Sequence, residues 1–177
     1  MKNLNTLMAV PDFEILTTLT LGTFPDKEEL KAAIDRSGCK QGQMLHWLID
    51  RPAFTLASTP TEVDLVNVSV RDLGFRHGAD PKHIVAELPS LGLAVCPPEV
   101  GPQLRLQRIR QRYCEQLRVF AEFVEGSDVN SRQRSRKCQL LYDVSNRDKG
   151  PELSWFLSRS GGSWNPDISF VFVKPRE

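Results

Sequence analysis

The sequence contains no long apolar run, no closely paired cysteines and only three histidines. A membrane-spanning helix needs about 20 predominantly apolar residues in a row, and no segment approaches that length. The short apolar patch near the N-terminus is interrupted by Asp12 and Glu14, and no small-residue cleavage site follows it. We therefore expect neither a membrane span nor a signal peptide, and we predict a cytoplasmic protein.

Metal-binding patterns are also absent. The cysteines, at positions 39, 96, 114 and 138, form no CxxC pair, whereas metal sites usually draw two ligands from one turn. His77 and His83 flank a predicted helix start, and His46 lies elsewhere, so no pair has the i, i+4 spacing that places two ligands on one helix face. We predict no metal site, and disulfides are not expected in a protein that is not exported.

The common catalytic motifs are missing as well. The sequence has no GxSxG elbow, no HExxH and no phosphate-binding loop. Because acid–base sites can assemble from residues far apart in the chain, this lowers the expectation of an enzyme without removing it. We expect a protein without a cofactor, and a non-enzymatic role ahead of an enzymatic one.

The chain has the size and composition of one globular domain. Its 177 residues can bury a sizeable core, and 40% are hydrophobic and 25% charged. Helical patterns dominate the N-terminal half and short strand patterns the C-terminal half. We predict a single α+β domain over residues 1–177, with N-terminal helices packed on a mainly antiparallel sheet. Residues 1–22 are expected to include a mobile segment, and residues 126–137 a polar basic loop.

Three segments predict helices: residues 24–38, 41–54 and 79–93. In the first, Asp26 precedes an acidic first turn, which suits the positive end of a helix. In the third, Asp80 is a typical N-cap, Pro81 suits the first helical position and Gly92 suits the end. Pro89 lies in the last turn and should shorten or kink that helix.

Four segments predict strands. Residues 62–70 alternate and are rich in β-branched side chains, which predicts a central strand covered by the 79–93 helix. The runs at 137–144, 152–158 and 167–174 are short, apolar or alternating, and they are separated by turn-forming residues. We interpret these three runs as antiparallel hairpins.

The segment 103–125 fits two patterns. Apolar residues recur at three- and four-residue steps, as in one long helix opened by Pro102 and closed by Gly126. The stretches "QLRLQ" and "QLRVFAEFVE" also alternate, as in strands. Pattern alone slightly favours the helix.

A set of short segments resembles a family of small, uncharacterised bacterial proteins. The segments are "TEVDLV", "DLGF", "GA", "LGL", "CPPEVGPQLRLQ", "WNPD" and "FVFV", and the resemblance runs from Phe24 to Lys174. It implies strands at 103–108 and 116–125, and it implies no activity, substrate or cofactor. The chain departs from the family at "RIRQRYCEQ" and at "NSRQRSRK", so its basic charge is its own.

That charge is concentrated in one part of the chain. The net charge is +1, but residues 101–140 hold nine Lys and Arg against four Asp and Glu. A cluster of this kind can neutralise phosphates, and an exposed tyrosine can stack on a base. It can equally be the solvated side of an ordinary strand or helix, and no known nucleic-acid-reading motif accompanies it. The candidate binding residues are Arg105, Arg108, Arg110, Arg112, Tyr113 and Arg118.

A second candidate lies in the turn "SGGSWNPD". Trp164 and Asn165 precede the last predicted strand, and an exposed tryptophan can anchor a partner or fold back over the core. Together with the arginines they suggest an interaction module for a protein or nucleic-acid partner. If Arg105, Arg108 and Arg118 lie on opposite faces, no basic patch exists.

Glu99 is the one candidate catalytic residue. It follows two prolines in "CPPEVGP", which restrict its backbone, and it precedes Arg105. A desolvated carboxylate there can act as a general base, with a histidine as the acid, in a small hydrolase or nuclease. The competing interpretation is an ion pair or a hydrogen bond to a loop amide. A purely structural role, seen as a homo-oligomer with a large apolar interface, is the third possibility.

Overall fold

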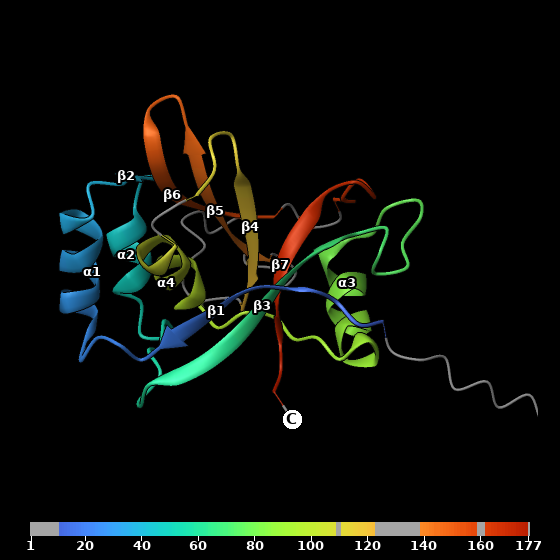
Figure 1. Cartoon of the computed structure of the whole chain (residues 1–177), viewed down its shortest axis with the longest axis horizontal. Coiled ribbons are helices and arrows are strands. Elements are labelled where there is room, and N and C mark those ends of the chain that lie inside the picture. The colour runs from blue at the N-terminus through green and yellow to red at the C-terminus, as the bar shows by residue number, and fades with distance from the viewer. Residues whose placement is uncertain (1–10, 109–110, 123–138, 159–161, 177) are drawn as a thin grey trace, which may run out of the picture.

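The computed structural model describes residues 11–108, 111–122, 139–158 and 162–176, and within these ranges seven strands form one sheet (Figure 1). Their order across the sheet is β1-β3-β7-β4-β5-β6-β2. The predicted basic loop at 126–137 lies outside the described residues. The strands are β1 (Ile15–Leu21), β2 (Lys40–Gln41), β3 (Thr61–Ser69), β4 (Gln116–Ala121), β5 (Leu140–Arg147), β6 (Gly150–Leu157) and β7 (Ser169–Lys174).

The helices of the described residues are α1 (Lys27–Arg36), α2 (Leu45–Ile49), α3 (Pro81–Glu87), the 3-10 helix η1 (Leu88–Leu91) and α4 (Val100–Gln107). The predicted starts of α1 and α3 are confirmed, since the Asp26 and Asp80 carboxylates accept hydrogen bonds from amides of the first turn. The α-helical part of the third segment stops before Pro89, and η1 ends at Gly92. The α+β class follows from these elements.

The sheet is mixed, with antiparallel pairs in the majority among the described strands. The pairs β1–β3, β3–β7, β4–β5 and β5–β6 are antiparallel, whereas β4–β7 and β2–β6 are parallel. The hairpin between β5 and β6 is confirmed. The expectation that the last strand continues this series of hairpins is wrong, because β7 inserts between β3 and β4. Phe170, Val171, Phe172 and Val173 are all buried, and a strand apolar on both faces belongs inside a sheet.

The strand predicted at 62–70 is found as β3, with a neighbour on each side and with α3 packed on it, but it is not at the centre of the sheet. β3 is an interior strand but lies next to the edge, where β1 covers its outer side. β1 itself comes from the segment expected to be mobile. Its sequence "ILTTLTL" is rich in β-branched residues and places Leu19 and Leu21 in the core.

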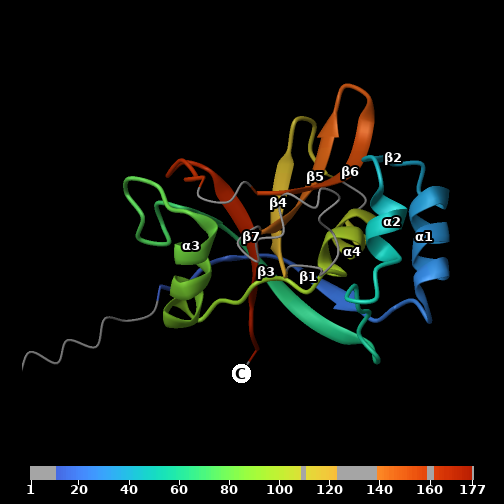
Figure 2. The same cartoon turned by 180° about the vertical axis from the view of Figure 1, so that it is seen from behind.

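Two hydrophobic cores lie on the two faces of the sheet. The first face carries α1, α2 and α4, with Leu65 of β3 in its core. The second face carries α3 and η1, whose Ile84 and Leu88 pack with Val66 and Phe170. The two views of the chain agree that α3 lies beside β3 and β7, and that α1, α2 and α4 gather near β5 and β6 (Figures 1 and 2).

The helix that contacts the most strands comes from the middle of the chain. α4 packs against β1, β4, β5 and β6, and α1 packs against α4 and α2. The first face is therefore layered as sheet, α4, then α1. Gly101 makes the close approach of α4 possible, because a Cβ there would overlap the buried ring of Tyr142 on β5.

The predicted strand at 103–108 is wrong, because these residues belong to α4 and its C-cap. Val100 and Leu104, four residues apart, point into the first core. Pro102 lies within the first turn, where a missing N–H leaves no helical hydrogen bond unmade. The single long helix is wrong too, since α4 ends at Gln107. The strand predicted at 116–125 is found as β4, which ends at Ala121.

The substitution Gly101→Ala tests the contact between α4 and Tyr142, because it decides whether the free energy of unfolding rises or falls. An alanine in an open helical position stabilises a protein by about 0.5–1 kcal/mol relative to glycine. Here the new methyl group collides with Tyr142, so we expect a loss of about 1–3 kcal/mol, as in overpacked cores. Urea unfolding measures it. In a Tyr142→Leu background the loss should shrink, and an unchanged loss would contradict this contact.

The C-terminal strand is tied to β3 and β1 by a charged cluster. The Arg176 guanidinium donates to both carboxylate oxygens of Asp64 at 2.8 Å, and also to Glu62. The Thr18 hydroxyl donates to Asp64 as well. These hydrogen bonds, from Arg176 first and then Thr18, lower the pKa of Asp64 from its ordinary 3.8 to about 2.

This cluster predicts a pH-dependent contribution to stability. Because the pKa of Asp64 is lowered on folding, its contribution is present above about pH 4 and is lost as the pH falls through about 2. Asp64→Asn should therefore destabilise the protein at pH 7, and the difference from wild type should shrink between pH 4 and pH 2. Urea unfolding across this range measures it, and Arg176→Met should follow the same curve. A constant difference would contradict the prediction.

Candidate functional site

Glu99 is a buried structural acceptor rather than an open catalytic group. Its side chain is in the interior, with a relative exposure of 1% for the residue. One carboxylate oxygen accepts hydrogen bonds from the Gly22 amide at 2.8 Å and from the Gln103 side-chain amide at 2.7 Å. The other accepts the Ala57 amide at 2.8 Å. The interpretation as a hydrogen bond to loop amides therefore describes what Glu99 does.

The two loops that Glu99 joins lie in direct contact. Gly22 has φ +67°, and a Cβ on it would lie 2.6 Å from the carbonyl oxygen of Thr59. Only glycine fits such a crossing without strain. Glu99 thus fixes the segment between β1 and α1 to the segment before β3.

Polar side chains of α4 extend this network to the edge of the sheet. Gln103 donates to the hydroxyl of Thr23, and Gln107 donates to the side-chain oxygen of Gln103. Gln107 also exchanges two hydrogen bonds with the backbone of Thr20, accepting its N–H and donating to its C=O. Its side-chain amide therefore occupies part of the outer edge of β1, as a neighbouring strand would.

The first arginines of the basic segment are used inside the fold. Arg105 is 5% exposed, and its guanidinium donates to Gln111 and to the carbonyl oxygens of Ser145 and Arg108. Burial lowers the pKa of Arg105. Arg108 forms an ion pair with Glu115 at 2.7 Å. Neither side chain is presented to a ligand as a free charge.

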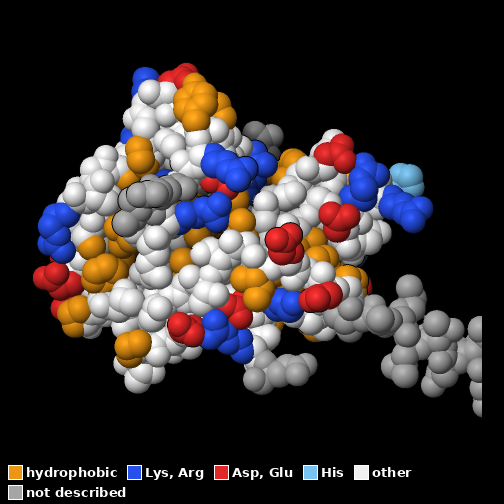
Figure 3. All heavy atoms as spheres, in the orientation of Figure 1, with side chains coloured by type: hydrophobic (Ala, Val, Ile, Leu, Met, Phe, Trp, Pro, Cys, Tyr) orange, Lys and Arg blue, Asp and Glu red, His pale blue; other side chains and the backbone are white. Residues whose placement is uncertain are grey.

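The remaining basic candidates do not join them. Arg118 alternates along β4 with Leu117 and Val119, which face the first core, so Arg118 faces the second side of the sheet, away from α4. Arg112 is exposed, and Tyr113 is exposed with its hydroxyl donating to Asp148. Arg110 lies outside the described residues. In the view of Figure 3, basic side chains stand beside acidic ones.

Trp164 is held in place by its backbone and its ring. Its N–H and C=O both pair with Ala79, and a Cβ on Gly78 would overlap its carbonyl oxygen. The indole packs edge to face on Phe170, with ring centroids 5.2 Å apart. Asn165 accepts the Asp167 amide and so shapes the turn. The turn thus presents the half-buried Trp164 in a fixed position.

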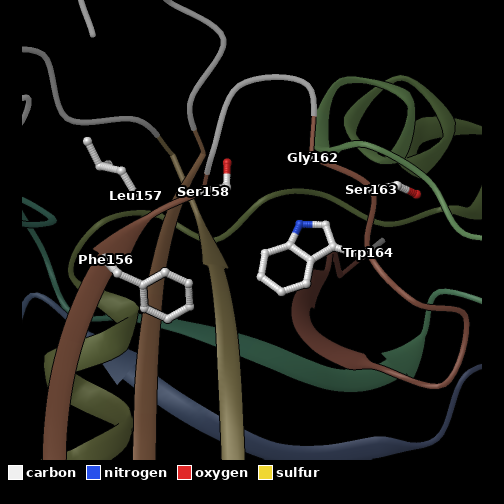
Figure 4. Close-up of a pocket in the computed structure, with 6 residues that line it drawn as sticks. All are labelled: Phe156, Leu157, Ser158, Gly162, Ser163 and Trp164. Carbon is white, nitrogen blue, oxygen red and sulfur yellow. The ribbon is translucent and has the colours of Figure 1, made fainter. Parts of the chain in front are cut away.

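Trp164 forms one wall of a largely apolar pocket of about 320 Å³. Figure 4 shows the rings of Phe156 and Trp164 on the same side of β4 and β5, facing a common space, with Leu157 pointing away. Phe156 is one of the large hydrophobic residues left exposed, at 36%. The lining residues are Phe156, Leu157, Ser158, Gly162, Ser163 and Trp164.

A polar row lies beside this pocket on the same face. The register aligns Arg118, Asp143 and Ser154 across β4, β5 and β6, two residues from the row of Phe120, Leu141 and Phe156. Two residues of strand separate the rows by about 7 Å. Asp143 accepts from Gln116 and lies 3.6 Å from Arg147, while its other oxygen is buried without a partner among the described residues.

No histidine is among the hydrogen-bond partners of Glu99 in the described residues. His46 lies 3.1 Å from Asp35, and His83 lies 3.0 Å from Asp80. Across the described ranges, no cluster of three His, Cys, Asp or Glu residues has the geometry to hold a metal ion. Burial raises the pKa of the Cys96 thiol, which keeps it protonated.

In the part of the chain that the structure describes, no helix has the length and apolar character required to cross a membrane. Searches of protein-family models, of curated proteins and of solved structures found no match to this chain. The resemblance to a bacterial family therefore stays a prediction.

The site residue that sequence reasoning missed is Phe156. It lies in a predicted strand, but nothing in "ELSWFLS" distinguishes a core aromatic from an exposed one. The alternation of Leu153, Trp155 and Leu157 on one face is the only available signal, since it leaves Phe156 on the other.

Glu99→Gln tests the structural role of the carboxylate. The new NH₂ group would face an amide N–H, and hydrogen bonds to a charged acceptor contribute about 1.5–3 kcal/mol each. We expect a loss of about 3 kcal/mol in the free energy of unfolding, measured in urea. Glu122→Gln, which removes the same charge at an exposed position, should change stability by less than about 0.5 kcal/mol. Equal effects would contradict the prediction.

Proposed function

We propose that this chain is a cytoplasmic, non-enzymatic interaction module that binds a segment of a protein partner at the Phe156–Trp164 pocket. The observation that carries the proposal is the pair of aromatic rings that face one apolar space of about 320 Å³. Buried aromatic anchors dominate the energy of protein interfaces, and ligand pockets are typically apolar with a few polar groups beside them.

The rigidity of the site supports this proposal. Trp164 is fixed through Ala79 and Phe170, so a partner side chain that enters the pocket orders little that is not already ordered. The polar row of Arg118, Asp143 and Ser154 offers hydrogen-bonding groups about 7 Å away, roughly two residues along an extended partner.

A protein partner fits these charges better than a nucleic acid does. Arg105 and Arg108 are used within the fold, and Arg118 and Arg147 share the open face with Asp143 and Glu152. A phosphate backbone needs several uncompensated cations, and the described residues of this face do not supply them.

The hydrolase or nuclease alternative has less support. General-base catalysis requires Glu99 to reach a substrate proton and a histidine to lie nearby. Both Glu99 oxygens accept internal hydrogen bonds, and among the described residues its partners are amides.

Selection of random peptides on the immobilised protein tests the proposal. We expect enriched peptides that carry large apolar residues, and at least a tenfold weaker affinity for the Phe156→Ser protein, measured by fluorescence anisotropy. Tyr113→Ser, which removes an exposed aromatic ring at another site, is the matched control and should not change the affinity.

Two outcomes would contradict the proposal: no enrichment of peptides, or enriched peptides that bind both variants equally. Labelled single-stranded RNA and duplex DNA are titrated in parallel at two salt concentrations. Binding to them that weakens steeply with salt and requires Arg118 would favour a nucleic-acid partner instead.

A further inference from the structure

The two edge regions of the sheet differ in how far their backbone hydrogen-bonding groups are covered. At one edge, β1 has a register irregularity between Ile15 and Thr17, and the side chain of Gln107 pairs with the backbone of Thr20. Irregular register and added hydrogen-bonding groups are devices that keep an edge from pairing with another chain. This edge is therefore partly closed by the protein itself.

At the other edge, β2 covers only the start of β6. Lys40 and Gln41 pair with Glu152 and Leu153, and the last hydrogen bond runs from the Gly42 amide to the Leu153 carbonyl at 2.8 Å. The chain then turns into α2. Beyond this point β6 continues through Leu157 without a second neighbouring strand among the described residues.

The register shows which backbone groups this leaves open. The Ser158 amide donates to the carbonyl oxygen of Gln139, just before β5, and the Leu153 carbonyl points the other way, toward β2. Because bonded and non-bonded residues alternate along an antiparallel pair, Trp155 and Leu157 direct their N–H and C=O groups away from β5. No described group forms a hydrogen bond with them.

The side chains at this open edge are large and apolar on both faces. Phe156 is exposed on the second face, while Trp155 and Leu157 are half-buried on the first, where Trp155 stacks with Trp47. The usual protection of an edge by charged residues or proline is missing from these three positions.

We infer that the Trp155–Leu157 edge is a strand-addition site for an extended apolar peptide of a partner protein. Added strands gain affinity from backbone hydrogen bonds and specificity from alternate side chains. The peptide would bond to Trp155 and Leu157, place one side chain beside Phe156 and place its neighbours beside Trp155. This inference rests on the proposed function, because it specifies how a partner reaches the Phe156 surface.

A second copy of the chain fits this edge less well. It would bring its own β2, which already covers Glu152 and Leu153, so only about three residues of each strand could pair. Such a contact falls well short of the roughly 1,000 Å² that a stable interface needs. A short peptide carries no such obstruction.

Two measurements test the mode of binding with a blocked, fluorescein-labelled hexapeptide enriched in the selection. Leu157→Pro removes an N–H that points away from β5. The substitution should therefore leave the hydrogen bonds between β5 and β6 intact and weaken the affinity for the peptide at least tenfold. N-methylation of the peptide nitrogens that face β6 should weaken binding by a similar factor, whereas methylation of the alternate nitrogens should not. The methylated peptides keep the test valid if the proline variant fails to fold.

Amide hydrogen exchange gives a direct readout. Bound peptide should slow exchange of the Trp155 and Leu157 amides and leave that of Phe156, already bonded to β5, unchanged. Peptides that need Phe156 but tolerate every methylation and leave these amides unprotected would overturn strand addition while the proposed function stands. A concentration-dependent dimer in sedimentation that Leu157→Pro abolishes would overturn this inference, because the occupant of the edge would then be a second copy of the chain.

Discussion

The carboxylate of Glu99 is the interaction on which the arrangement of the first face depends. It sits at the start of α4 and accepts amides from the segments before α1 and before β3. The pairing of Leu21 with Thr61 brings these two segments together, and Glu99 holds both of them against the start of α4. With both loops fixed, α4 is seated between α1 and the sheet, and Gly101 lets it touch Tyr142. A buried charge is tolerated there because each oxygen is bonded to N–H groups.

Helix α4 also determines which parts of the surface are covered by the protein's own polar side chains. Gln107, two turns from Glu99, occupies the edge of β1, and Arg105 binds the loop that leads into β4. The polar residues of α4 therefore form hydrogen bonds that cover the first face and one edge of the sheet. What stays open lies on the other side of the molecule, at Phe156, Trp164 and the end of β6.

Local chemistry in the sequence determined the elements that depend on neighbouring residues alone. The helix caps at Asp26 and Asp80 and the break at Pro89 follow from backbone geometry within one turn. The β5–β6 hairpin follows from two apolar runs joined by a short turn. The strand at 103–108 is implied by the resemblance, whereas the pattern slightly favours a helix. The helix is found because Val100 and Leu104, four residues apart, face the same core.

The sequence by itself determined that the chain forms an α+β domain with a basic middle segment. Only the tertiary structure decided what those charges do, because side chains near in sequence can face opposite sides of a sheet. Arg105 and Arg118 are separated by thirteen positions, yet Arg105 is buried within α4 on the first face and Arg118 lies on the second face of the sheet. The pairing of Phe156 with Trp164 likewise depends on where β7 inserts. Strand order is set by long-range packing, which no local pattern encodes.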